Sequence, residues 1–370
     1  MNKNREEWLD ALRGFAMLLV IWGHCGKNQL FNAICLINVP LFICITGYIN
    51  GIKFREREKI TKEDYIKIIK HYVYPYLTYG ILYEACSYVN GLIGLRLTGT
   101  MKDARLYSMA LNFIQFEAGT VWFLIPLALA EFVYFIMLTS LNIIWKGKVK
   151  TIFKALFICL LSIGLMGMIG LLNPQRFFTQ NSGVLIGCLK HLYYLIQRSF
   201  AFVFFLGLGS FCHSVIKDRI LSNKKQAIIG CICLGVFCMK FESEIWAFAE
   251  IRWLSDYNQL RYFFMSSMLC FPLFLLFSHV SNHLSILQYI GRNTLIINGT
   301  HFTFNIVEIM KRWLRRCFVN LSSPFIITLL TMILTIIVEL VIIVPIFNGS
   351  LRFMNDYDEI IAKIKFKKKG

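Results

Sequence analysis

Long apolar runs alternate along the chain with short polar segments in which most charged residues are basic. A helix needs roughly 20 residues to cross a hydrocarbon core of about 30 Å, and the runs approach or exceed that length. They predict ten membrane-spanning helices, over residues 9–26, 33–51, 72–95, 120–144, 153–172, 191–212, 226–241, 262–280, 289–309 and 324–347. The pattern therefore predicts an all-α polytopic membrane bundle, with residues 1–348 as one transmembrane domain and 349–370 as a basic tail.

The composition excludes a soluble globular protein. Of the 370 residues, 57% are hydrophobic and only 16% are charged, against about 25% charged in an average soluble domain. A net charge of +18 is compatible with nucleic-acid binding, but the basic residues lie between the apolar runs rather than in one patch. The expected partner of this surface is the lipid bilayer, and no nucleic acid is expected.

The loop charges predict the orientation in the membrane, because Lys and Arg accumulate on the cytoplasmic side. Basic residues are dense in segments 53–70, 146–154 and 217–225 and in the tail at 363–369. We therefore expect a multi-pass protein of the cell membrane with both termini in the cytoplasm. One basic segment, residues 311–316, would lie outside. Either the ninth helix is misplaced or that segment lies amphipathically on the membrane.

The first apolar run predicts a retained membrane helix rather than a cleaved signal peptide. It contains Arg13 and His24, and no small-residue cleavage motif follows it. The twelve cysteines are scattered, mostly inside apolar runs. This distribution favours buried small hydrophobic side chains over disulfides, and no metal site is expected.

The same helix carries the richest set of ionisable residues, namely Asp10, Arg13 and His24. At 100° per residue, Arg13 and His24 project from one face about 16 Å apart, and Asp10 lies one turn from Arg13, where it can pair with it. In the simplest interpretation Arg13 extends to the inner interface and His24 to the outer one. The shared face favours a functional stripe in which His24 is a general base.

Several motifs, in this order and spacing, resemble the acyltransferase 3 family of integral-membrane acyltransferases. The family signature of an Arg, ten residues and a His in the first helix is matched by Arg13 and His24. The other matching segments are VPLFICITGY at 39–48 with Thr46 in place of the usual Ser, the basic stretch ending in YPYL at 74–77, WFL at 122–124, FFLGLGSF at 204–211 and IGRNTLIINGTH at 290–301. Within the family the fucose O-acetylase branch is the most similar.

The resemblance implies a membrane-bound O-acyltransferase that modifies surface polysaccharides or other extracytoplasmic acceptors. Acyl-CoA, usually acetyl-CoA, would be the cytoplasmic donor substrate, and a hydroxyl of the glycan would be the acceptor, with no permanently bound cofactor. Arg13 would then hold coenzyme A phosphates, since a guanidinium matches phosphate oxygens. His24 would take a proton from the attacking hydroxyl or from an acyl-enzyme intermediate, and Asp10 would orient Arg13.

Further candidates come from the resemblance and from the cost of polar groups in the membrane. They are Lys67 and Lys70 for the coenzyme A phosphates, and Thr46, Trp122, Arg198 and His301 for the substrate. The two lysines also fit an ordinary cytoplasmic face, and the tryptophan an interfacial anchor. Arg198 could equally pair with a carboxylate such as Glu131 or Glu84, and the histidine could be a packing residue.

A transporter or flippase of lipid-linked sugars is the alternative of another class. It would also be a helical bundle with interior charges, and broken helices would mark its binding site. No inverted repeat is visible in the sequence. A purely structural membrane protein would explain the apolar runs but not the polar stripe of the first helix.

Overall fold

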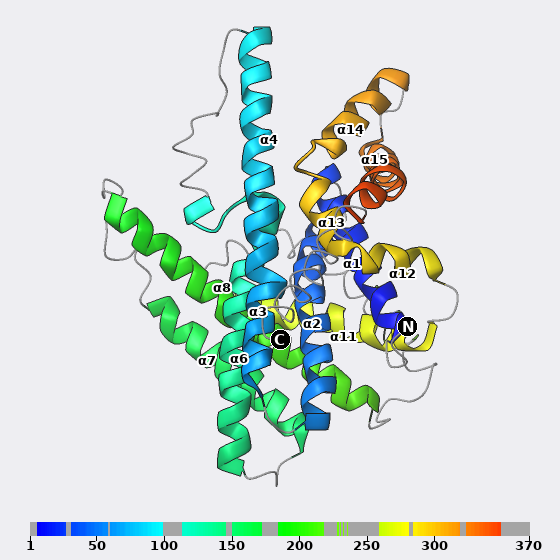
Figure 1. Ribbon diagram of the computed structural model, residues 1–370. Coiled ribbons are helices and arrows are strands. Elements are labelled where there is room, and N and C mark those ends of the chain that lie inside the picture. Colours follow the sequence, from blue (N-terminus) through cyan, green and yellow to red (C-terminus); the bar gives the residue numbers. More distant parts are fainter. Residues whose placement is uncertain are drawn as a thin grey trace, which may run out of the picture.

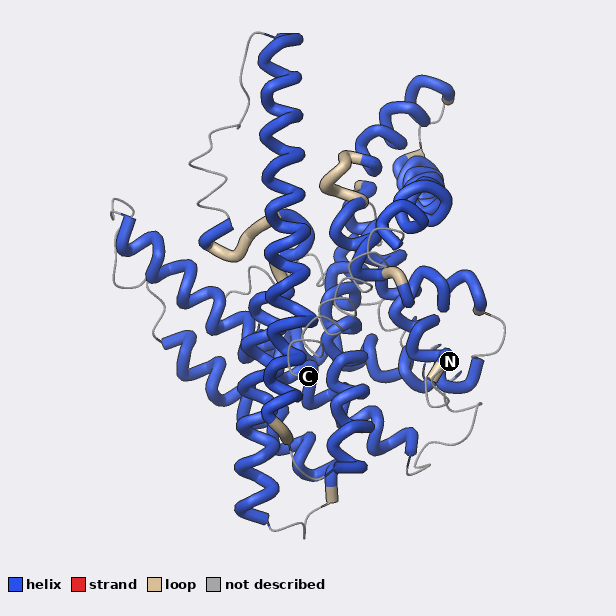
Figure 2. Tube along the Cα trace, in the orientation of Figure 1, coloured by secondary structure: helices blue, strands red, loops and turns tan. Residues whose placement is uncertain are grey.

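The computed structural model describes residues 6–26, 31–57, 60–98, 113–145, 150–171, 184–217, 259–280, 284–318 and 323–348, with four further positions between 228 and 235. The described part consists of helices with a few turns and loop residues, and it contains no strand (Figures 1 and 2). The chain is therefore an all-α polytopic membrane protein, as the apolar pattern predicts.

The helices in chain order are α1 (Glu7–Cys25), α2 (Phe31–Arg57), α3 (Lys62–Ile68), the π-helical turn η1 (Ile69–Val73), α4 (Tyr74–Thr98), the 3-10 turn η2 (Gly119–Val121), α6 (Leu124–Trp145), α7 (Thr151–Leu171), α8 (Val184–Lys217), α11 (Gln259–Val280), α12 (Ser285–Arg292), α13 (Thr294–Thr300), α14 (Ile306–Cys317), α15 (Pro324–Val338) and the π-helical turn η6 (Glu339–Ile343). Figure 1 shows α7 on one side of the molecule and α12 to α15 on the other, with α2 between them.

Six helices of the described part are long and apolar enough to cross a membrane. They cover Ile34–Phe54, Gly119–Trp145, Thr151–Ile169, Cys188–Ile216, Tyr262–His279 and Pro324–Asn348. The predicted spans 9–26 and 72–95 are helical as α1 and α4 but are not among these six. Span 226–241 lies almost entirely outside the described residues, so the number of ten spans stays a prediction.

The prediction of one continuous helix over residues 289–309 is wrong. The structure divides this stretch into α12, α13 and the beginning of α14. Asn293 leaves the helical conformation between α12 and α13, and Asn305 adopts the left-handed conformation (φ 54°) before α14. Asparagine tolerates such backbone geometry better than other non-glycine residues, which explains why the chain changes direction there.

Glycines allow two pairs of helices to pack backbone against backbone. A Cβ on Gly14 of α1 would lie 2.0 Å from the Leu287 carbonyl oxygen, and one on Gly291 of α12 would meet the Asp10 carbonyl oxygen. The same arrangement joins α2 to α8 at Gly47. Small residues at helix contacts are typical of membrane bundles. At the first of these contacts the glycines are chain neighbours of charged site residues, so α12 is held directly against α1.

Candidate active site

The charged end of α1 is organised by a buried carboxylate. Asp10 is almost fully buried, and its Oδ1 lies 3.7 Å from Nη1 of Arg13 while its Oδ2 lies 3.2 Å from Nε of Arg292 on α12. The pairing of Asp10 with Arg13 that the helical spacing predicts is therefore confirmed. Arg292 is a further partner that the spacing does not indicate. The carboxylate fixes the orientation of both guanidinium groups.

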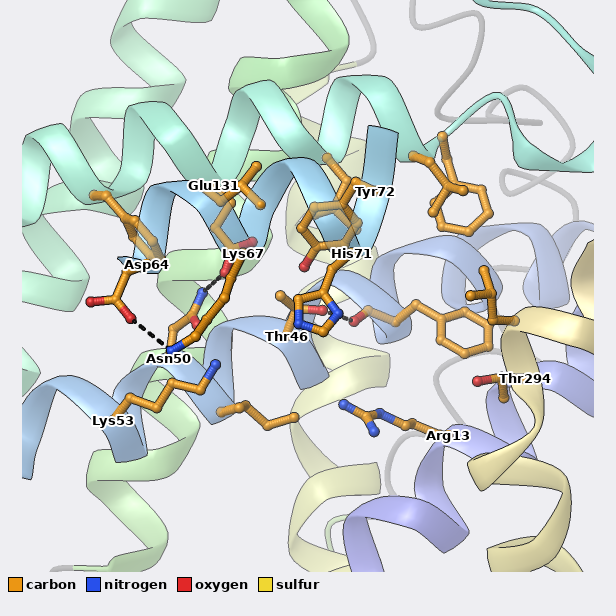
Figure 3. A pocket seen from close by; sticks show the side chains of 18 of the residues that line it. Arg13, Thr46, Asn50, Lys53, Asp64, Lys67, His71, Tyr72, Glu131 and Thr294 are labelled. Atoms are coloured by element: carbon orange, nitrogen blue, oxygen red, sulfur yellow. Dashed lines mark hydrogen bonds and ion pairs between the residues drawn. The ribbon is translucent and has the colours of Figure 1, made fainter. Parts of the chain in front are cut away.

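Arg13 faces an open cavity of about 300 Å³ lined by α1, α2, α3, η1, α6 and α13. Its polar lining includes four basic side chains, Arg13, Lys53, Lys67 and His71, and Figure 3 shows all four directed into it. Thr46 also lines the cavity, and its hydroxyl donates a hydrogen bond to the Phe42 carbonyl oxygen at 3.2 Å. The lining therefore carries positive charge that suits an anionic ligand.

The cavity lining also carries two carboxylates that already have partners. Glu131 of α6 accepts a hydrogen bond of 2.6 Å from the amide of Asn50 on α2. Asp64 caps the first turn of α3 by accepting from the backbone and hydroxyl of Thr61, and it lies 3.7 Å from the Lys67 ammonium. The contact of Glu131 joins α6 to α2, and the contacts of Asp64 order the first turn of α3 and hold Lys67 at the cavity wall.

His71 lies in the π-helical turn η1, immediately before α4. Such turns are rare and are frequently found at functional sites. Partial burial and the nearby ammonium groups of Lys53, Lys67 and Lys70 lower the pKa of His71. At neutral pH the ring is therefore neutral, and a bound anion would favour its protonation.

At the other end of α1, His24 meets a second histidine. The rings of His24 and His301 have their centroids 5.2 Å apart, and Phe302 contacts the His24 ring at the same distance. His301 is fully buried, and its Nδ1 donates a hydrogen bond to the Ile297 carbonyl oxygen at 2.7 Å. In the neutral ring this assigns the hydrogen to Nδ1 and leaves Nε2 as a base. Among the described residues that Nε2 has no hydrogen-bond partner.

A buried carboxyl group lies close to this histidine pair. Glu339 is fully buried at the beginning of the π-helical turn η6, and its Oε2 accepts a hydrogen bond of 2.9 Å from the hydroxyl of Thr300, the residue before His301. Its other oxygen, Oε1, has no hydrogen-bond partner among the described residues. An ionisable residue inside an apolar span is a functional candidate by default, although no sequence motif indicates a role for Glu339.

Asn298 connects the cavity to the histidine pair. It lines the cavity and lies one helical turn before His301. Its side-chain amide donates to the Thr120 carbonyl oxygen at 3.2 Å, and its own carbonyl oxygen accepts from the Thr120 hydroxyl. This two-way contact joins α13 to η2. The wall of the cavity is thereby fixed at the point where it approaches His301.

Trp122 and Arg198 form a third group. The guanidinium of Arg198 lies 5.5 Å from the centroid of the Trp122 ring and 6.0 Å from that of Tyr194, and its Nη2 donates to Glu117 Oε1 at 3.3 Å. The carboxylate partner is Glu117, so the pairing with Glu131 or Glu84 is wrong. Because Glu117 lies in the loop before η2, helix positions alone could not indicate it.

The predicted site residues thus fall into three groups. Arg13, Thr46 and Lys67 share the cavity, His24 and His301 contact each other, and Trp122 contacts Arg198. The exposed Lys70 does not line the cavity, and its role in donor binding stays a prediction. The further site residues are Lys53, His71, Asn298, Arg292 and Glu339.

Comparison with protein families gives the class of the protein. A family model described as an acyltransferase domain matches residues 6–344, almost the whole chain. The chain belongs to the acyltransferase 3 family. It is therefore a membrane acyltransferase. The match does not distinguish branches of the family, so similarity to the fucose O-acetylases stays a prediction. No curated protein and no solved structure matches the chain.

Proposed function

We propose that this acyltransferase moves an acyl group, in the first place acetyl, from cytoplasmic acyl-CoA to a hydroxyl of a glycan outside the cell membrane. The observation that carries the proposal is the arrangement of α1. One end of this helix brings Arg13 to a basic cavity, and the other end brings His24 to a second histidine. Donor and acceptor sites on one helix axis fit a transfer between the two sides of a membrane.

The cavity is the donor site in this proposal. Coenzyme A carries several phosphate groups, and Arg13, Lys53 and Lys67 present a guanidinium and two ammonium groups to the cavity. Arg13 and Lys67 are each held by a carboxylate, so their side chains are oriented before the donor binds. Such ordering lowers the entropic cost of binding.

The length of α1 matches the length of the donor. Eleven residues separate Arg13 from His24, which corresponds to about 16 Å along an α-helix. A pantetheine arm of comparable reach would place the thioester beside His24. The arm would pass Asn298, which lines the cavity and precedes His301 by one turn.

His24 acts as the general base in the proposed transfer. It takes the proton of the acceptor hydroxyl while the hydroxyl oxygen attacks the thioester carbonyl carbon. The bond between that carbon and the coenzyme A sulfur then breaks, and the thiolate leaves and receives the proton from His24. The Nδ1 of His301 donates to the Ile297 carbonyl oxygen. Its Nε2 is therefore the atom that stabilises the protonated ring of His24.

The donor site is tested by Arg13→Lys in the purified full-length protein. The substitution keeps the charge but replaces a two-pronged phosphate contact by a point charge. Since a hydrogen bond to a charged group contributes about 1.5–3 kcal/mol, we expect acetyl-CoA to bind about tenfold more weakly or worse. Isothermal titration of the detergent-solubilised protein measures this.

The matched control is Lys62→Ala, which removes an exposed charge of α3 that does not line the cavity. This variant should bind acetyl-CoA as the wild type does. Unchanged binding by Arg13→Lys would refute the assignment of the cavity to the donor. It would return Arg13 to the role of an interfacial residue that extends towards the membrane surface.

A further inference from the structure

α14 is a short amphipathic helix at the end of α1 that carries His24. Ile306, Val307 and Leu314 are buried against the neighbouring helices, whereas the basic residues at 312, 315 and 316 are exposed. At 100° per residue, Lys311 and Arg315 share the edge of the polar face next to Val307, and Arg312 and Arg316 share the opposite edge. The helix thus presents two pairs of cations, each pair one turn apart.

Only part of this charge is neutralised within the described residues. Arg312 Nε lies 3.0 Å from Glu308 Oε1, whereas Lys311, Arg315 and Arg316 have no carboxylate within ion-pair distance there. Like charges at positions i and i+4 destabilise a helix, so the pair Lys311 and Arg315 lowers the stability of α14. The orientation proposed above also places this segment outside, where basic residues are normally depleted.

Lys311 connects this edge of α14 to the histidine site. Its ammonium group lies beside Gly26, 3.9 Å from where a Cβ on that glycine would be. Gly26 follows the last residue of α1 and is two residues from His24. The negative end of the α1 dipole stabilises one cation there. This dipole explains the position of Lys311. It does not explain that of Arg315, which lies one turn further along the exposed face.

We infer that Lys311 and Arg315 bind an anionic group of the acceptor, so that the acceptor glycan carries carboxylates or phosphodiesters close to the hydroxyl that is acylated. The inference rests on the proposed function and names the chemical class of its acceptor. An anion held at Lys311 lies at the end of α1 next to His24, whereas the donor phosphates are held at the Arg13 end. The two anionic substrates therefore occupy opposite ends of one helix.

Binding of labelled oligosaccharides to the full-length protein in nanodiscs of phosphatidylcholine tests the inference. The probes are oligogalacturonate and oligo(glycerol phosphate), with maltohexaose as the neutral comparison. The wild type should bind both anionic probes with an affinity that falls as salt is added. The double variant Lys311→Ala/Arg315→Ala should bind them at least tenfold more weakly and should not change the binding of maltohexaose.

The matched control is Arg312→Ala/Arg316→Ala, which removes the same charge, at the same spacing, from the other edge of α14. It should change the affinity for the anionic probes by less than about threefold. Equal loss in both double variants would show a diffuse surface charge and overturn the inference, as would unchanged binding by Lys311→Ala/Arg315→Ala. The inference would also be overturned if Lys311→Ala/Arg315→Ala lost affinity for the anionic probes only in nanodiscs that contain phosphatidylglycerol. The basic face of α14 would then bind lipid headgroups.

Acetyl-CoA binding is measured in the same preparations. Both double variants should bind acetyl-CoA as the wild type does, because α14 does not line the donor cavity. If the wild type binds the anionic oligosaccharides but not acetyl-CoA, the proposed donor is wrong while the anion site on α14 stands. If it binds acetyl-CoA but not the oligosaccharides, the inference about the acceptor fails and the donor site stands.

Discussion

Gly14→Ala should separate α1 from α12 and disturb the charged end of the site. The new Cβ would lie 2.0 Å from the Leu287 carbonyl oxygen, whereas ordinary contact begins at 3.4 Å, so the backbones must move apart by about 1.4 Å. Overpacking of this kind costs about 1–3 kcal/mol, and a clash with backbone rather than with a flexible side chain favours the upper end. At about 2 °C per kcal/mol for a large chain, the apparent melting temperature should fall by roughly 6 °C.

The same displacement should reduce activity more than stability alone would. Gly14 is next to Arg13, and α12 carries Arg292, whose Nε is 3.2 Å from Asp10. Misplacing a bound substrate by about 1 Å can lower a rate about 100-fold even when the substitution is far from the chemistry. Acetyl transfer per folded molecule should therefore fall well below that of the wild type.

Gly164→Ala is the matched control for this substitution. It places the same methyl group in the middle of α7, where nothing lies within 4 Å of the new Cβ. Since alanine favours a helix over glycine by up to about 1 kcal/mol, this variant should be as stable as the wild type or slightly more stable. Thermal unfolding in detergent compares the two. Equal melting temperatures for Gly14→Ala and Gly164→Ala would refute the close contact between α1 and α12.

The pH dependence and the orientation give two further predictions. Burial and neighbouring lysines lower the pKa of His71 in the free protein, and bound phosphate should raise it again. Acetyl-CoA should therefore bind more tightly as the pH falls through the His71 pKa of the bound state, and the affinity should stop rising below the His71 pKa of the free state. His71→Gln should flatten this profile, and an identical profile would remove His71 from the donor site. On an otherwise Cys-free background, an impermeant thiol reagent added to intact cells should label the exposed Cys317 and spare a cysteine introduced at Lys62; the opposite labelling would invert the protein in the membrane.

Local geometry of the site was predictable where it depends on one helix. The face shared by Asp10 and Arg13 follows from the helical repeat, and their contact is present in the structure. The apolar runs likewise predict most of the long helices within a few residues of their observed ends. Periodicity is sufficient for such features because they need no knowledge of which helices are neighbours.

Contacts between distant segments could not be read from the sequence. Arg292 reaches Asp10 across 282 residues of chain, and Arg198 pairs with Glu117 rather than with a carboxylate of a predicted span. The sequence indicates no role for Glu339 because its hydrogen bond with Thr300 forms only when α13 packs beside the last helix. Each of these partners is determined by tertiary packing, which has no local signature.

The apolar pattern also does not predict the helix breaks in the region 285–317. The run predicts one span, but the conformations of Asn293 and Asn305 divide it. These breaks place α13 at the cavity and α14 at the end of α1. The basic segment 311–316, whose charge conflicts with the predicted orientation, lies in the short amphipathic helix α14, and its placement on the membrane surface stays a prediction.

The central claim is that His24 performs the transfer while the cavity at Arg13 holds the donor. His24→Ala measures it most directly, with His279→Ala, at the end of α11 and not in the lining of the donor cavity, as the matched control. A base at the reacting centre contributes about 10²–10⁴-fold, so His24→Ala should lower the acetyl content of the cell-surface glycan to the level of cells without the protein. The amount of folded protein in the membrane and its affinity for acetyl-CoA should equal those of the wild type and of His279→Ala. Wild-type acetylation by His24→Ala would contradict the account.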